Sequence, residues 1–137
     1  MPIQCIIVTP ERTVLEQAVD SVVATLPDGE IGVWPQRAPL IGRLGCGEMR
    51  VASGGKVQRY YVEGGFIEAL EDVVTVLTGR AVLASEIDES VAMEQLASAR
   101  ARPANTPELM AIRDRAVEQT RAQLHEAQRA RQMRDEG

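Results

Sequence analysis

The chain of 137 residues is poor in aromatic side chains, and its four aromatic residues are Trp34, Tyr60, Tyr61 and Phe66. It has 15 Lys and Arg residues against 20 Asp and Glu residues, a formal net charge of -5, and Lys56 is its only lysine. Proteins that hold nucleic acid need a basic surface, and those that bind single strands also stack bases on aromatic rings. The two shortages therefore argue against nucleic acid and against an anionic lipid surface as the partner.

Cysteine and histidine are also scarce. Two cysteines, Cys5 and Cys46, do not form a disulfide framework, and we expect two reduced thiols. His125 is the only histidine, and it stands in a polar stretch where a solvated or helix-facing imidazole is the expectation. No Cys or His pair has metal-ligand spacing, and no carboxylate stands in an apolar stretch that would adapt it to acid–base work. The sequence therefore predicts no catalytic residues and no metal site.

Long apolar runs are absent as well. No stretch reaches the roughly 18 apolar residues of a membrane-spanning helix, so we expect no direct membrane insertion. The N-terminus opens without a basic segment ahead of an apolar one, and no signal peptide is expected. Any association with a membrane must then run through a partner protein.

Large apolar side chains are present, but they are unevenly distributed. Residues 2–84 hold 31 of them (Val, Ile, Leu, Met, Phe, Trp, Tyr), and residues 85–137 hold 10. The first segment can bury a core, whereas the second, rich in Ala, Arg, Glu and Gln, can form helices but has little to bury. We therefore predict two domains, residues 1–84 and 85–137, the second being stable only when it docks on another surface.

Short apolar runs between turn signals characterise the first domain. The signals recur every ~8–12 residues, which is typical of a small β-sandwich or barrel. Gly54-Gly55 is predicted to form a two-residue hairpin turn. A phosphate loop is excluded there, because Arg50 and Val57 stand where such a loop needs Gly and Ser or Thr. Strands are expected at residues 3–8, 19–26, 49–53, 56–62, 66–70 and 73–77.

Helix signals characterise the second domain. The first helix follows a capping segment at residues 85–88 and ends at about Arg102, because Pro103 stops it. The second begins with Thr106 as N-cap and Pro107 at the first helical position, and runs to about Arg134. A linker of about four residues makes the helices an antiparallel hairpin. A narrow stripe is expected along the second helix: Leu109, Ile112, Ala116, Thr120, Leu124 and Ala127.

A series of short motifs follows in order along nearly the whole chain. They are Val8-Thr9-Pro10-Glu11, Val19-Asp20-Ser21-Val22-Val23, Gly29-Glu30-Ile31-Gly32-Val33, Ala38-Pro39-Leu40, Gly64-Gly65-Phe66, Val73-Val74-Thr75-Val76-Leu77, Ile87-Asp88-Glu89 and Ala92-Met93-Glu94. Each is weak alone, but the ordered set resembles the ε subunits of bacterial F-type ATP synthases, the counterparts of the mitochondrial δ subunit. The resemblance implies a β-sandwich of about ten strands followed by a two-helix hairpin.

The resemblance also implies a function. Members of the family lie in the central rotor stalk, bound to the γ subunit and resting on the ring of c subunits, and they catalyse nothing. In bacteria they often restrain ATP hydrolysis when the hairpin extends along γ toward the α and β subunits. This chain would then lie at the cytoplasmic face of the bacterial inner membrane as a peripheral part of the complex.

A loop facing the c ring is implied at residues 30–40, with Glu30, Trp34, Gln36 and Arg37 as contacts. The family commonly has Gly-His before Ala-Pro, where this chain has Gln36-Arg37. The charge of Arg37 would suit polar or acidic loops of the c subunits, and the alternative is a solvated arginine. Trp34, beside Pro35, is expected to be partly buried, either in a rigid turn or at the interface.

An ATP-binding pattern of many bacterial members is incomplete here. That pattern is Ile or Leu, Asp, two residues, Arg, Ala, and this chain supplies Ile87, Asp88 and Ala92 with Val91 at the arginine position. Valine offers a phosphate neither donors nor charge. We therefore expect no cofactor, and Asp88 is accounted for as a helix N-cap.

Arginines on the second helix form the last candidate site. Arg113, Arg115 and Arg121 could engage acidic loops of the α and β subunits transiently, or they could belong to a solvated face. Three other readings remain: a nucleotide-sensing module, which Val91 disfavours; a hydrolase with a sandwich cleft, which the lone His125 disfavours; and a sandwich adaptor without a tie to ATP synthase.

Overall fold

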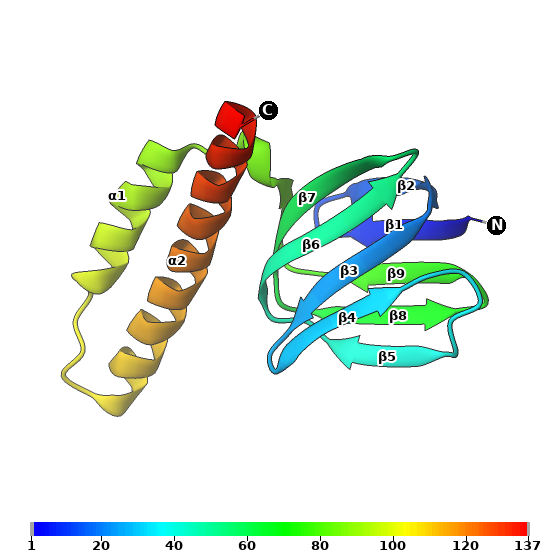
Figure 1. Ribbon diagram of the computed structural model, residues 1–137. Helices are drawn as coiled ribbons and strands as arrows, with labels where there is room; N and C mark the ends of the chain where they lie inside the picture. Colours follow the sequence, from blue (N-terminus) through cyan, green and yellow to red (C-terminus); the bar gives the residue numbers. More distant parts are fainter. Residues whose placement is uncertain (1, 137) are drawn as a thin grey trace. The chain divides into compact units, whose positions relative to one another are not determined.

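The chain divides into two compact units, Met1–Leu83 and Ala84–Gly137, in the computed structural model, which describes residues 2–136 and the side chains of residues 2–132. The first unit consists of ten β-strands in two sheets, and the second consists of a short 3₁₀ turn and two helices (Figure 1). The predicted fold class, a β-sandwich followed by a helical hairpin, is confirmed.

Each sheet of the sandwich has five strands. One has the order β2-β1-β9-β8-β5 and the other β10-β7-β6-β3-β4 (Figure 1). The pairings are antiparallel apart from that of β1 with β9, which is parallel. The strands are β1 (Ile3–Val8), β2 (Thr13–Val19), β3 (Ser21–Leu26), β4 (Gly29–Val33), β5 (Leu40–Arg43), β6 (Cys46–Ser53), β7 (Lys56–Glu63), β8 (Phe66–Leu70), β9 (Val73–Leu77) and β10 (Ala81–Leu83).

The strands that the sequence pattern missed are the four at the sheet edges: β2, β4, β5 and β10. An edge strand pairs on one side only, tends to be short, and tolerates polar residues and glycine, so its apolar signal is weak. The single strand expected at residues 19–26 is wrong in its start. Asp20 separates β2 from β3, and its carboxylate accepts a hydrogen bond from the Gly54 N–H at 3.0 Å.

The predicted hairpin turn at Gly54-Gly55 is confirmed. Ser53 pairs with Lys56 across it, so the connection between β6 and β7 has two residues. Both glycines have left-handed backbone, with φ of 59° and 80°. Such a turn matches the twist of the flanking strands and needs residues that adopt positive φ without strain, which is why glycine occupies both positions.

The second unit contains η1 (Ala84–Glu86), α1 (Glu89–Arg100) and α2 (Pro107–Glu136). Both predicted N-caps are confirmed. The Asp88 carboxylate accepts a hydrogen bond from the Val91 N–H at 3.2 Å, and the Thr106 hydroxyl accepts one from the Leu109 N–H at 3.1 Å. The first helix ends two residues before the predicted Arg102.

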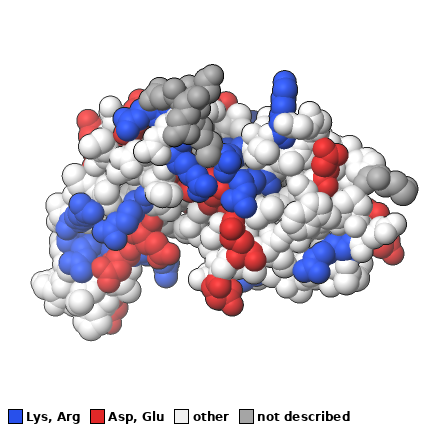
Figure 2. Space-filling view, in the orientation of Figure 1, with Lys and Arg blue, Asp and Glu red and all other residues white. Residues whose placement is uncertain are grey.

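Most of the buried apolar residues of the second unit are alanines, and Gln123 and Glu126 are buried as well. The apolar residues that are buried in this unit, among the side chains described, are Ala84, Ala92, Leu96, Ala99 and Ala127. Arg131 Nη1 lies 3.1 Å from Glu89 Oε1, which ties the end of α2 to the start of α1. Charged side chains of both signs are intermixed on the exposed surface of the helices (Figure 2).

The predicted apolar stripe of α2 is right only in its C-terminal half. Ala127 is buried, whereas Leu109 and Ile112 are exposed. The reason is a difference in length, since α1 has 12 residues and α2 has 30. Glu89, at the start of α1, pairs with Arg131 of α2. Both helices rise by the same distance per residue, so the end of α1, 11 residues after Glu89, lies beside about residue 120 of α2. The first turns of α2 therefore project past the end of α1.

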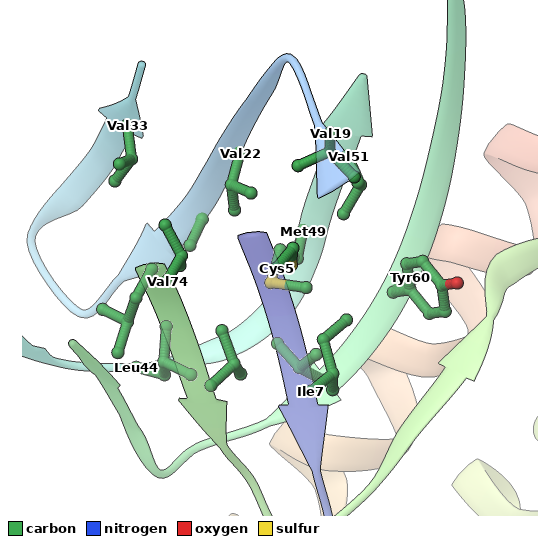
Figure 3. Close-up of a cluster of buried hydrophobic side chains, with 14 of the residues drawn as sticks. Cys5, Ile7, Val19, Val22, Val33, Leu44, Met49, Val51, Tyr60 and Val74 are labelled. Carbon is green, nitrogen blue, oxygen red and sulfur yellow. The ribbon is translucent and has the colours of Figure 1, made fainter. Parts of the chain in front are cut away.

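The apolar core lies between the two sheets. In β1 the buried side chains are Ile3, Cys5 and Ile7, every second residue, as expected for a strand with one face on a core. Figure 3 shows side chains of both sheets pointing toward one another, including Cys5, Ile7 and Val74 of the first sheet and Val22, Met49 and Val51 of the second. The core cluster comprises residues of Ile3 to Ala81, so the strand unit has an apolar interior of its own.

Candidate functional site

The loop between β4 and β5 is fixed to a neighbouring hairpin turn. Gln36 has left-handed backbone, with φ of 65°, and its N–H donates a hydrogen bond of 2.7 Å to Asp72 Oδ1. Asp72 belongs to the two-residue turn between β8 and β9, and its carbonyl oxygen accepts a hydrogen bond from the Gln4 N–H at 2.8 Å. Segments from three parts of the sequence thus meet at one end of the sandwich.

Trp34 is partly buried, as predicted, and its side chain is 56% exposed. The indole lies against Gly32 in β4, where a Cβ atom would collide with the Cζ3 and Cη2 atoms of the ring. One region of the ring therefore packs on the main chain of Gly32, and the rest faces solvent as an apolar surface at the loop.

Gln36 and Arg37 are exposed in the same loop. Arg37 forms no ion pair with any residue that the structure describes, so its charge is available to a partner. The flanking turn adds two exposed apolar side chains, Leu70 and Val73. The loop and the turn together form what we call the end surface, defined by residues 34–39 and 70–73.

Glu30 does not belong to this loop, which corrects the prediction. It lies in β4 opposite Thr25, and Arg50 Nη1 lies 3.1 Å from its Oε2. Because β4 is an edge strand with weak apolar character, the sequence pattern at residues 30–33 does not distinguish a strand from a loop. Glu30 thus takes part in a cluster on the second sheet and not in the end surface.

The centre of that cluster is Glu48, which the sequence reasoning missed. Its side chain is 5% exposed, and Oε1 accepts hydrogen bonds from Arg50 Nη1 at 2.6 Å and Arg59 Nη1 at 3.0 Å. The hydrogen bond to Glu48 is the main reason that the pKa of Arg50 is raised. A signal was present in the sequence, because Glu48 and Arg50 are two apart on a strand and Arg59 pairs with Arg50 in the predicted hairpin.

An exposed apolar patch lies on the outer face of the first sheet. Ile41, Phe66 and Leu77 are 73%, 53% and 51% exposed, and they come from the adjacent strands β5, β8 and β9. With Glu68 and Thr75 they line a shallow depression of about 260 Å³. Contiguous exposed apolar side chains of this kind mark interaction surfaces. The sequence pattern did not reveal the patch, because β5 was not predicted.

The incomplete ATP pattern occupies the start of α1. Asp88 is engaged as the N-cap, Ala92 is buried, and Val91 points outward with a side chain that is half exposed. Ile87 precedes the cap and is half-buried. On α2, Arg115 and Arg121 are exposed, and Arg113 pairs with the adjacent Asp114 at 3.0 Å. Arg113 and Arg115 stand on the turns that project past α1.

The described part of the chain contains no metal site, no disulfide and no membrane-spanning helix. Within it, no group of His, Cys, Asp and Glu residues could hold a metal ion. His125 is exposed. Cys5 and Cys46 are free thiols. Neither α1 nor α2 has a stretch that is both long and apolar enough to span a bilayer.

Comparison with known proteins identifies the family. Residues 2–84 match the family described as "ATP synthase, Delta/Epsilon chain, beta-sandwich domain". A relative from Rhodopirellula baltica named "ATP synthase epsilon chain" is 47% identical over 124 residues, which cover 90% of this chain and 97% of the relative. The chain belongs to the ATP synthase epsilon-chain family. The family resemblance predicted from the ordered motifs is therefore confirmed.

Other relatives agree with this assignment. An ATP synthase epsilon chain from Herpetosiphon aurantiacus is 40% identical, with 84% of this chain and 78% of the relative covered. Among solved structures, a chain in "Cryo-EM structure of Euglena gracilis mitochondrial ATP synthase, OSCP/F1/c-ring in rotational state 1" matches with a TM-score of 0.79 at 25% identity, over 88% of this chain and 78% of that chain. A chain in "Cryo-EM structure of Tetrahymena thermophila mitochondrial ATP synthase - central stalk/cring" shares the fold, with a TM-score of 0.71 at 11% identity over 90% of this chain and 95% of that chain.

Proposed function

We propose that this chain is a non-catalytic rotor subunit of a proton- or sodium-translocating ATP synthase at the cytoplasmic face of the bacterial inner membrane. It links the γ subunit to the c ring, and its hairpin restrains ATP hydrolysis by reaching the α and β subunits. The observation that carries the proposal is the match over 97% of the length of an ATP synthase epsilon chain. The likeness to a chain from an OSCP/F1/c-ring structure supports the place in the stalk.

The end surface suits the c ring as its partner. It presents an exposed tryptophan, an arginine without a described ion partner, and two exposed apolar side chains from the adjacent turn. Aromatic and arginine side chains supply much of the binding energy at protein interfaces. The hydrogen bond between Gln36 and Asp72 holds the loop before binding, so less conformational freedom is lost on docking.

The apolar patch of Ile41, Phe66 and Leu77 suits the γ subunit. Its three strands are neighbours, so the patch is continuous and rigid. Burying an apolar side chain removes it from water at a gain of about 1.5–3 kcal/mol. A partner that covers these three partly exposed side chains gains part of the free energy that offsets the cost of association.

The hairpin suits a two-state role. Its buried apolar residues are mostly alanines, so the packed state gains little free energy from burial. Two arrangements of similar free energy can then exchange, and differential contacts with a partner select one of them. The projecting turns of α2 carry Arg113 and Arg115, which would engage the α and β subunits in the extended arrangement.

Recovery of the native complex tests the proposal. An affinity tag on the C-terminus of the chromosomal copy should recover γ, c, α and β subunits in detergent extracts, in the proportions of an assembled synthase. Recovery of the tagged chain with other proteins and without γ or c would contradict the proposed place in the rotor. It would favour a sandwich adaptor instead.

A further inference from the structure

Three non-glycine residues of the described chain have left-handed backbone, and all three lie at the end surface. Gln36 has φ of 65° in the β4–β5 loop, and Glu71 and Asp72, with φ of 51° and 62°, form the β8–β9 turn. Left-handed backbone is unfavourable for a residue with a Cβ atom, and it persists where the surroundings hold it. The two-residue β8–β9 turn itself requires positive φ at Glu71 and Asp72. Gln36 lies outside a hairpin turn, so its left-handed backbone needs a contact that holds it.

Asp72 makes that contact. Its carboxylate Oδ1 accepts the Gln36 N–H at 2.7 Å, and its carbonyl oxygen accepts the Gln4 N–H at 2.8 Å. A hydrogen bond of this length to an ionised acceptor is among the stronger kinds in proteins. The turn is itself fixed, because Leu70 and Val73 pair on either side of it. One residue therefore connects the start of β1, the β8–β9 hairpin and the loop that carries Trp34 and Arg37.

We propose that Asp72 is a positioning residue for docking on the c ring. Its carboxylate holds the main chain of Gln36, and so presents the side chains of Trp34 and Arg37 together with Leu70 and Val73 as one pre-formed surface. The inference rests on the proposed function, and it adds that the binding surface is composite. The β8–β9 turn sets the conformation of the loop and contributes part of the contact area.

Substitutions in the turn separate the carboxylate from the backbone conformation. Asp72→Gly removes the acceptor but adopts left-handed backbone readily. Asp72→Asn keeps an oxygen acceptor and also tolerates this backbone. Glu71→Gly is the matched control, because it relaxes the adjacent left-handed residue and leaves the Asp72 carboxylate in place.

Amide hydrogen exchange in the full-length subunit tests the contact itself. In Asp72→Gly the exchange rate of the Gln36 amide should rise about tenfold or more, because its acceptor is lost. Asp72→Asn should retain most of the protection, and Glu71→Gly should leave it unchanged. Unchanged exchange at Gln36 in Asp72→Gly would overturn the proposal.

Docking is followed in the same variants by the emission of Trp34, the only tryptophan, on addition of purified c rings. Asp72→Gly should weaken the apparent affinity about tenfold. Asp72→Asn should stay near the wild type, and Arg12→Glu, in the β1–β2 turn at the opposite end of β1, should match the wild type. Faster exchange at Gln36 with full affinity for c rings would overturn the positioning role. A wild-type subunit that does not bind c rings would overturn the proposed docking and this inference with it, while the exchange data would still show whether the contact exists.

Discussion

At the residue scale, burial keeps the thiol of Cys5 in its neutral form by raising its pKa. Cys5 lies in the centre of the core, and desolvation raises the pKa of its thiol from 9.0 to about 12. Cys46 begins β6 and is half-buried. The neutral form of Cys5 is thus kept in the folded protein at a pH where an unfolded chain would ionise it.

This difference gives a pH-dependent prediction. Between pH 9 and pH 12 the unfolded state loses the Cys5 proton and the folded state keeps it, so the stabilisation that is complete below pH 9 is lost as pH rises, by about 1.4 kcal/mol per pH unit. Urea unfolding of the wild type and of Cys5→Val at pH 8 to 10.5 measures it. The slope with pH should be shallower in Cys5→Val than in the wild type. Equal slopes in the wild type and Cys5→Val would contradict the assignment.

The buried carboxylate of Glu48 shows why single residues of this kind are hard to find from sequence. Its neighbours Arg50 and Arg59 are visible in the hairpin that the Gly54-Gly55 turn predicts. Strand alternation places Glu48 on the face of β6 opposite Met49 and Val51, and it does not reveal that this carboxylate is buried. The partial burial of Trp34 was predicted from its place beside proline. The surface that supports the ring, the main chain of Gly32, was not.

At the element scale, the strands predicted from the sequence are the interior ones, and the strands missed are the edges. Interior strands such as β9 carry a clear signal, because nearly all of their residues are apolar or β-branched. Edge strands such as β4 and β5 include glycine and charged residues. The loop expected at residues 30–40 therefore begins later than predicted, because residues 30–33 belong to β4.

The caps of the helices were predictable because the signals are local. Asp88 and Thr106 each accept a hydrogen bond from the N–H three residues later. The extent of the apolar stripe on α2 was not predictable, because it depends on how far α1 extends along it. Helical periodicity shows which residues share a face, but not which part of that face has a neighbour.

Asp88 provides a prediction for the start of α1. Asp88→Ala should destabilise the helix by about 1 kcal/mol through loss of the cap, and Asp88→Asn should cost much less, since asparagine is an equally good cap. Neither variant nor the wild type should bind ATP at micromolar concentration, because Val91 offers no charge to a phosphate. Circular dichroism of the full chain measures the helix, and isothermal titration calorimetry measures ATP binding. Micromolar affinity of the wild type, lost in Asp88→Ala, would show that the carboxylate serves a ligand.

At the scale of the whole molecule, apolar residues are segregated between the two units. The core cluster comes from the strand unit, and the hairpin buries mainly alanines. This unequal division was visible in the sequence as a count of large apolar side chains. It is the physical reason to propose that the sandwich supplies a fixed attachment and the hairpin a part that changes position.

Deletion of residues 86–137 tests the role of the hairpin in the assembled synthase. The sandwich keeps its core, so γ and c subunits should still be recovered with it. If the restraining state is favoured over the other by zero to about 1 kcal/mol, its removal should raise ATP hydrolysis roughly two- to sixfold. Recovery of γ and c serves as the control for assembly. Unchanged hydrolysis in a complete complex would exclude a restraining role.

Docking of the end surface on the c ring is the central claim, and the emission of Trp34 tests it most directly. On addition of purified c rings, the emission maximum of the wild-type subunit should shift to shorter wavelength as the exposed indole leaves water. Arg37→Glu should abolish the shift at the same concentration. Arg12→Glu should retain it, because Arg12 lies in the β1–β2 turn, at the opposite end of β1 from the end surface. A wild-type spectrum that does not change on binding, or an Arg37→Glu variant that binds as tightly as the wild type, would contradict the account.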